Sequence, residues 1–225
     1  MLFRMPKPMH GWREFFHEIT IVVIGVLLAL GGAQLINTLR ARSEVASFRA
    51  AVNHELGRNL GIYQRVIAQR PCAQRRLAEL ERFLADTSAG RTDRLVRPIG
   101  RPFLQTLYFS AWDNKGAVMD DLPLALRLQY GELYDEFRND EKVLLNEREV
   151  WRSMSLAEQS EALDHADRMR MRELLTRAEQ FNEVAKPNYD YVANLAQALH
   201  IRPIGDPNLA QVASDQSFCQ PLLTK

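Results

Sequence analysis

The residues best suited to chemistry are histidines and clustered carboxylates, and their spacing decides what they can do. The stretch His54-Glu55-Leu56-Gly57-Arg58 matches only the first two positions of the zinc-protease motif HExxH. That motif needs a second histidine at its fifth position, because two imidazoles one helical turn apart bind the same metal ion. Arg58 stands there instead, so we interpret His54 as a surface histidine.

Paired carboxylates recur along the second half of the chain, at Asp120-Asp121, Asp135-Glu136, Asp140-Glu141 and Glu147–Glu149. A calcium loop needs alternating ligands and a glycine at its sharp turn, and residues 135–140 lack that glycine. We therefore predict that these acids form the solvated face of a helix, paired with nearby basic residues. No GxSxG motif and no glycine-rich phosphate loop occurs. The sequence thus predicts no enzyme and no catalytic, cofactor-binding or metal-binding residue.

The chain contains two cysteines, Cys72 and Cys219. Both follow the uncharged, apolar residues 19–39, so both lie on the same side of any membrane that these residues cross. In an oxidising compartment an isolated pair predicts a disulfide, which would tie the C-terminal tail to the helices. Two free thiols in a cytoplasmic domain are the alternative.

Residues 19–39 contain no charged side chain, and a helix of this length covers the roughly 30 Å apolar core of a bilayer. We favour a retained anchor over a cleaved signal peptide, because the preceding flank, 1–18, contains Glu14 and Glu18 and the apolar run is long. A short flank before a long domain predicts a cytoplasmic N-terminus and a periplasmic C-terminal domain. Arginines on the two sides are nearly balanced and give little further guidance.

Small residues recur at four-residue steps within the apolar run, at Gly25, Ala29 and Ala33. Such spacing lets two helix backbones approach closely, which predicts a homodimer contact in the membrane. Glycine and alanine are also common in single membrane helices, and that remains the alternative.

Apolar residues at three- and four-residue steps predict helices throughout residues 40–200. The first helix would run from about 11 to 69 and be followed, after a turn at Pro71, by a second, shorter helix. If the second helix folds back along the first, its end returns toward the membrane. Further helices are predicted from about 103 to 120, from 123 to 151, from a capping box at Ser155 to a break at Pro187, and around 191–199. Residues 201–225 should be irregular. The fold class is therefore all-α, an N-terminal transmembrane helix continuing into an antiparallel helical bundle.

Two further groups of side chains were considered for contact with lipid or with a ligand, and they lead to different expectations. Four arginines in the linker after the second helix would meet anionic lipid headgroups if that helix returns to the membrane, or else form a solvated loop: Arg91, Arg94, Arg97 and Arg101. Five aromatic residues at helical spacing favour a core over a ligand pocket: Tyr108, Trp112, Tyr130, Tyr134 and Trp151.

The segment Glu18 to Leu30, EITIVVIGVLLAL, resembles the anchor of an uncharacterised family of bacterial single-span membrane proteins. That family's pattern is roughly E-x-x-x-V-V-I-G-(I/V)-L-(I/L)-A-L. Ala111-Trp112-Asp113 and residues 122–134 are similar to its helical soluble part. The resemblance implies the single-span topology and adds no active site.

The sequence predicts a membrane-anchored, non-enzymatic accessory or scaffolding protein of the bacterial inner membrane. Its expected partners are the lipid bilayer and another membrane or envelope protein. The net charge of +1 gives no electrostatic reason to expect nucleic acid. The alternative is a periplasmic ligand-sensing helical bundle that acts through a partner, because the 18-residue flank is too short for a signalling domain.

Overall fold

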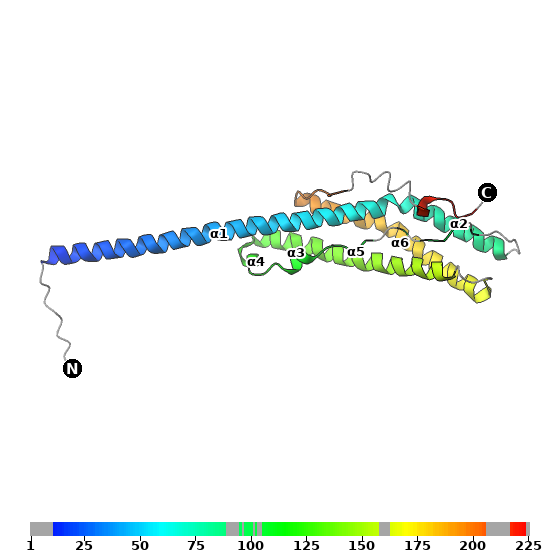
Figure 1. Ribbon diagram of the computed structural model, residues 1–225, viewed down its shortest axis with the longest axis horizontal. Coiled ribbons are helices and arrows are strands. Elements are labelled where there is room, and N and C mark those ends of the chain that lie inside the picture. The colour runs from blue at the N-terminus through cyan, green and yellow to red at the C-terminus, as the bar shows by residue number, and fades with distance from the viewer. Residues whose placement is uncertain are drawn as a thin grey trace, which may run out of the picture. The chain divides into compact units, whose positions relative to one another are not determined.

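A computed structural model of the protein describes residues 11–88, 95, 97–100, 102, 105–157, 163–205 and 217–223, without the side chains of residues 13, 14, 156, 157 and 217. All regular elements in this part of the chain are helices, which confirms the predicted all-α class (Figure 1). They are α1 (Trp12–Ala68), α2 (Arg70–Ser88), α3 (Ser110–Asp113), α4 (Val118–Asp121), α5 (Leu124–Ala157), α6 (His165–Ala198) and the 3-10 turn η1 (Ser217–Cys219).

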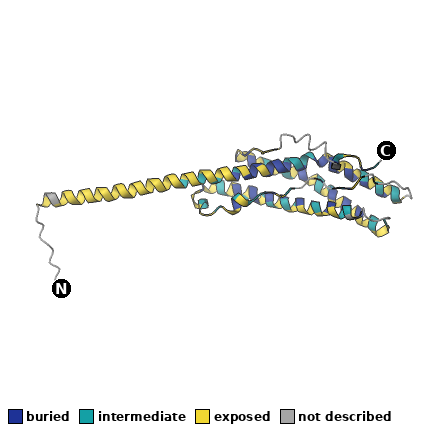
Figure 2. Ribbon diagram, in the orientation of Figure 1, coloured by how far each residue is buried: buried dark blue, intermediate teal, exposed yellow. Residues whose placement is uncertain are grey.

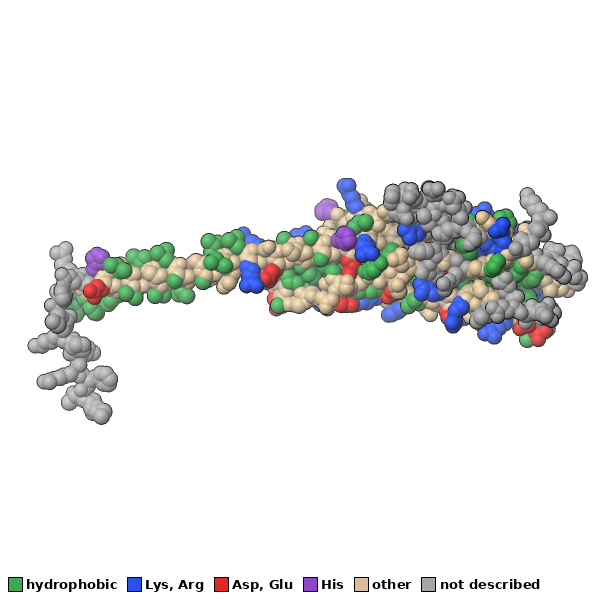
Figure 3. All heavy atoms as spheres, viewed as in Figure 1, with side chains coloured by type: hydrophobic (Ala, Val, Ile, Leu, Met, Phe, Trp, Pro, Cys, Tyr) green, Lys and Arg blue, Asp and Glu red, His purple; other side chains and the backbone are tan. Residues whose placement is uncertain are grey.

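The chain divides into two compact units, Met1–Phe48 and Arg49–Lys225. The described part of the first unit is essentially the first part of α1, and residues 19–39 are exposed along its whole length (Figure 2). Hydrophobic side chains cover this stretch in the space-filling view, whereas charged side chains are scattered over the second unit (Figure 3). Within the described residues, one helix is long and apolar enough to cross a membrane, and it contains this segment.

The second unit is a bundle of three helical rods, which are α1 from Arg49 onward together with α2, then α5, and then α6. Pairs of side chains give their directions. The Tyr130 hydroxyl donates to Asn53 Oδ1 at 2.7 Å, and Glu147, later in α5, binds Arg70 at the start of α2, so α5 runs parallel to α1. Asn188 in α6 donates to Asp140 in α5, and later residues of α6 meet earlier residues of α5, so these two helices are antiparallel.

A parallel pair requires a connection that returns along the bundle, and described residues on either side of it show the return. The Pro98 carbonyl accepts from Arg76 of α2 at 3.5 Å, whereas the Tyr108 backbone bonds to Asn59 of α1. α3 follows, and its Ser110 hydroxyl and Ala111 N–H bond to Glu55 of α1.

The predicted turn at Pro71 and the fold-back of the second helix are wrong. α2 begins at Arg70, and Pro71 lies in its first turn, where a missing N–H breaks no helical bond. The Tyr189 ring of α6 packs on Tyr63, whereas Leu175, 14 residues earlier on α6, lies beside α2. That separation along α6 is roughly 20 Å, so α2 continues onward from α1.

Three other predicted boundaries are also wrong. The third helix is reduced to two single turns, α3 and α4, and residues 105–109 are irregular. Ser155 lies inside α5, where its hydroxyl bonds to the Trp151 carbonyl; the capping box belongs to Asp164, whose side chain accepts from the Asp167 N–H at 2.8 Å. α6 runs straight through Pro187, because buried residues continue on both sides of it.

The main core cluster lies between α2, α5, α6 and η1 and includes Leu77, Leu80, Leu84, Val150, Trp151, Met171, Leu175 and Leu222. The expected core role of the aromatic residues is confirmed for Trp112, Tyr130, Tyr134 and Trp151, which are buried, whereas Tyr108 is half-buried. The described part of the tail is irregular apart from η1, yet it is packed into this core.

Candidate functional site

The C-terminal tail is fastened to α2 by a disulfide between Cys72 and Cys219, which are separated by 147 positions in the chain. The predicted pairing is thus confirmed. η1 brings Cys219 and Phe218 to the helix, and the Phe218 ring packs edge-on against Trp151 at 5.3 Å between centroids. The disulfide therefore closes a loop that contains all of α5 and α6.

Polar contacts on the same face of α2 reinforce the disulfide. Arg76 lies one turn after Cys72 and is 2 % exposed; its Nη2 donates to the Phe218 carbonyl at 2.8 Å and to the Gln220 carbonyl at 3.1 Å. The Glu79 carboxylate accepts from the Leu222 N–H at 2.8 Å. Residues 72, 76 and 79 follow helical spacing, so one stripe of α2 holds the backbone of the tail. We call these contacts and the disulfide the tail clamp.

A second polar cluster joins α3 and α5 to α1. The buried Glu55 carboxylate accepts from the Tyr134 hydroxyl at 2.7 Å, and from the Ser110 hydroxyl and the Ala111 N–H at 2.9 Å each. Burial, followed by the hydrogen bond to Glu55, raises the pKa of the Tyr134 hydroxyl. The Trp112 ring stacks on Tyr134 at 4.9 Å between centroids. Glu55 is thus surrounded by donors from the protein itself.

Asp140 occupies a third buried polar cluster, where α1, α5 and α6 meet. Its Oδ1 accepts from Asn188 Nδ2 at 3.0 Å, and it also interacts with the Tyr63 hydroxyl. Burial raises the pKa of Asp140 to about 6, against the opposing effect of these two hydrogen bonds. Its Oδ2 is buried and has no hydrogen-bond partner. An ionised Asp140 is therefore only partly compensated by its surroundings.

Arg70 and Glu147 form a buried, two-pronged ion pair between the start of α2 and α5. Their Nη1–Oε1 and Nη2–Oε2 distances are 2.6 and 2.9 Å, and the Trp151 indole N–H also donates to Glu147. The prediction that the acids of α5 are solvated is wrong for Asp140 and Glu147, which are 5 % and 1 % exposed. Their partners lie 48 and 77 positions away in the chain, beyond the reach of local patterns.

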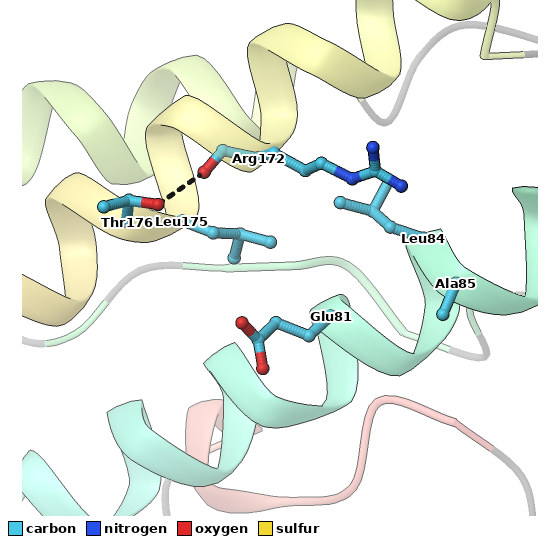
Figure 4. Close-up of a pocket in the computed structure, with 6 residues that line it drawn as sticks. All are labelled: Glu81, Leu84, Ala85, Arg172, Leu175 and Thr176. Atoms are coloured by element: carbon cyan, nitrogen blue, oxygen red, sulfur yellow. Dashed lines mark hydrogen bonds between the residues drawn. The ribbon is translucent and has the colours of Figure 1, made fainter.

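The described part of the second unit has surface hollows, and two of them have a volume of about 330 Å³ or more. The first, of about 330 Å³, lies between α2 and α6, with Glu81 and Arg172 on opposite helices around Leu84 and Leu175 (Figure 4). The second, of about 530 Å³, is lined by His54, Arg58, Gly61, Ile62, Arg65, Gln105, Ile204 and Gly205. In the first hollow the Thr176 hydroxyl donates to the Arg172 carbonyl at 3.1 Å. In the part of the chain described here, no three His, Cys, Asp or Glu side chains could hold a metal ion.

The segment after α6 packs against two glycines of α1. The Ile204 N–H donates to the Gly57 carbonyl at 2.8 Å, and a Cβ at Gly61 would lie 2.1 Å from the Ile204 carbonyl oxygen. The contact is made by the irregular residues 201–205, which follow α6.

The remaining predicted residues are not brought together by the structure. Gly25, Ala29 and Ala33 are exposed on one face of α1, and their proposed contact with a second copy stays a prediction. His54 is exposed, in agreement with its interpretation as a surface histidine. Arg97 is exposed, whereas Arg91, Arg94 and Arg101 lie outside the described residues. Because α2 does not fold back, the geometric reason for placing these arginines at lipid headgroups no longer holds.

No protein-family model, curated protein or solved structure matches this chain. The resemblance of residues 18–30 to a family of bacterial anchors therefore stays a prediction. The fold and its buried sites define a disulfide-clamped helical bundle preceded by a long apolar helix.

Proposed function

We propose that the chain is a membrane-anchored, non-enzymatic accessory or scaffolding protein of the bacterial inner membrane, whose bundle lies in the periplasm and binds other membrane or envelope proteins. The observation that carries this proposal is the joining of a fully exposed apolar segment to a disulfide-clamped bundle in one chain.

Exposure of residues 19–39 supports the anchor. Most side chains in this stretch are apolar, none is charged, and none is covered by the rest of the protein. An uncharged surface of this length is unfavourable in water and matches the thickness of a bilayer core. The apolar and aromatic residues just before it, Trp12, Phe15 and Phe16, are exposed as well and suit the headgroup region.

The disulfide supports a periplasmic location for the bundle. Thiols remain reduced in the bacterial cytoplasm and pair in the periplasm, and Cys72 and Cys219 are paired. Because both cysteines follow residues 19–39, a periplasmic bundle leaves the flank 1–18 in the cytoplasm.

The use of the buried charges supports a scaffolding role. Glu55, Arg70 and Glu147 all bind groups of other helices. Side chains of this kind position helices and leave no ionisable group free to act on a substrate in these clusters. The bundle therefore acts through binding at its surface.

Co-purification of the full chain tests this proposal. The chain, tagged after Lys225, is extracted in mild detergent, and a control carries residues 1–48 fused to an unrelated soluble domain. We expect an envelope protein in fixed proportion with the full chain and absent from the control. A chain that purifies alone at every detergent concentration would contradict a scaffolding role.

A periplasmic ligand-sensing bundle is the second candidate, and the larger hollow favours it. His54 and Arg58 line this hollow, and the Arg58 guanidinium lies 4.1 Å from the centroid of the Tyr108 ring. Such a site suits small anions. A rise in melting temperature with citrate or phosphate, lost in Arg58→Ala, would favour this function over scaffolding; no shift with either anion would count against it.

A further inference from the structure

Two exposed leucines stand one helical turn apart at the start of α5. Leu124 and Leu128 are 60 % and 64 % exposed, and their four-residue spacing places them on one face of the helix. The other large apolar side chains exposed in the described part of the second unit occur singly: Leu145, Met169, Val184, Tyr191 and Ile204. Single exposed apolar residues are ordinary, whereas these two leucines form one continuous apolar face at the start of α5.

The two leucines lie at the end of the bundle that begins with Arg49. Tyr130 bonds to Asn53, and α5 runs parallel to α1, so Leu124 and Leu128 lie about 9 and 3 Å before that contact along α5. They are therefore level with the first turn of the unit. Leu145 is near the Arg70–Glu147 pair, about 25 Å further along the same helix.

The chain keeps this end of the bundle near the membrane. Arg49 lies ten positions after Leu39, and this stretch spans at most about 35 Å even when fully extended. This limit holds for any angle between the two units. We propose, on the basis of the membrane anchor in the proposed function, that Leu124 and Leu128 insert into the interfacial region of the bilayer that holds residues 19–39.

The size and charge of the surface favour lipid over a protein partner. Two leucines cover far less than the roughly 800 Å² that each side of a stable protein interface buries. A tether of ten residues makes contact with the bilayer effectively intramolecular, so a small apolar surface is sufficient. Charges of both signs adjoin the leucines, since Asp120 and Asp121 are exposed just before α5 and Arg127 is half-buried beside Leu128. The contact is therefore apolar, and we expect it to be insensitive to salt and to the fraction of anionic lipid.

Photolabelling of the full chain in proteoliposomes tests this contact. The vesicles contain phosphatidylethanolamine and phosphatidylglycerol with a small fraction of a phospholipid that has a diazirine in its acyl chain. Trypsin separates the relevant residues, since Leu124 falls in peptide 116–127, Leu128 in 128–138 and Leu145 in 143–148. Leu145 is the matched control, being an exposed leucine of the same helix.

We expect label in residues 19–39 and in both leucine peptides, and none in the peptide of Leu145. Leu124→Asp with Leu128→Asp should lower label in the two peptides about tenfold or more, because each buried leucine contributes strongly to partitioning. Label confined to residues 19–39 overturns the contact and leaves the anchor intact. Absence of label from residues 19–39 overturns the anchor itself. Crosslinks from these leucines to a co-reconstituted protein in place of lipid also overturn the inference.

Discussion

Removing the disulfide of the tail clamp should destabilise the bundle without changing its fold. The perturbation is the double substitution Cys72→Ala with Cys219→Ala. The Arg76 contacts to the Phe218 and Gln220 carbonyls do not depend on the sulfur atoms, so the tail should remain docked in the absence of denaturant. The loss should therefore appear chiefly as a less restricted unfolded chain.

The length of the closed loop sets the magnitude. For a sequence separation of 147, the loop-entropy relation gives about 5 kcal/mol at 25 °C, and measured values are often smaller. We expect the free energy of unfolding to fall by about 3–5 kcal/mol. This is a large fraction of the 5–15 kcal/mol that stabilises a typical domain.

Equilibrium unfolding in urea, on the full chain in nonionic detergent micelles, measures this loss. Trp112 and Trp151 are buried in the second unit and report its unfolding by fluorescence. Reducing the wild-type chain should produce the same shift, and the reductant should leave the double variant unchanged. A loss below about 1 kcal/mol would refute the loop-entropy reasoning, and a changed spectrum without urea would refute the independence of the tail contacts.

Three other substitutions test the buried polar groups and the close backbone contact. The pKa of Asp140 is raised to about 6, so the carboxyl ionises at a lower pH in the unfolded chain, and the free energy of unfolding falls as the pH rises from about 4 to 6. Relative to wild type, the free energy of unfolding of Asp140→Asn should therefore be about 2–3 kcal/mol higher at pH 7.5 than at pH 4, as measured by urea unfolding at both values. Glu147→Gln should cost about 3–5 kcal/mol by leaving the Arg70 charge buried, whereas replacing both residues by apolar ones should cost less in the same assay. Gly61→Ala should cost about 1–3 kcal/mol, because its Cβ would overlap the Ile204 carbonyl; an unchanged melting temperature would contradict that contact.

The long helices were predictable because their signal is local. An uncharged run from 19 to 39 and apolar residues at helical spacing up to 67 indicate α1, and the structure bounds it at Trp12 and Ala68. The disulfide was also predictable, since two cysteines allow only one intramolecular pairing.

Proline misled the prediction in two places, because its effect depends on position and packing. Pro71 lies in the first turn of α2, where its missing N–H costs nothing. Pro187 lies inside α6 and should cost about 3 kcal/mol. Buried Ala185 before it and Val192 and Ala196 after it maintain one packed stripe, and this burial outweighs the lost bond.

The buried polar sites could not be read from the sequence. Glu147 stands in a run of charges that looks solvated, and its partner Arg70 is far away in the chain. In the sequence, Glu55 stands out only as part of an incomplete zinc motif, yet in the structure it joins α1 to Ser110 and Tyr134. The direction of α2 decides which helices meet, and no local pattern specifies that direction.

Protease treatment of intact spheroplasts, followed by non-reducing mass spectrometry of the washed membranes, tests both the anchor and the periplasmic location of the bundle. External protease should degrade residues 49–225, the N-terminal part should stay in the membrane uncut, and the untreated chain should contain the Cys72–Cys219 bond. A chain cleaved near Ala33 and released by washing would identify residues 19–39 as a signal peptide. A bundle protected from protease and carrying free thiols would place it in the cytoplasm and contradict the account.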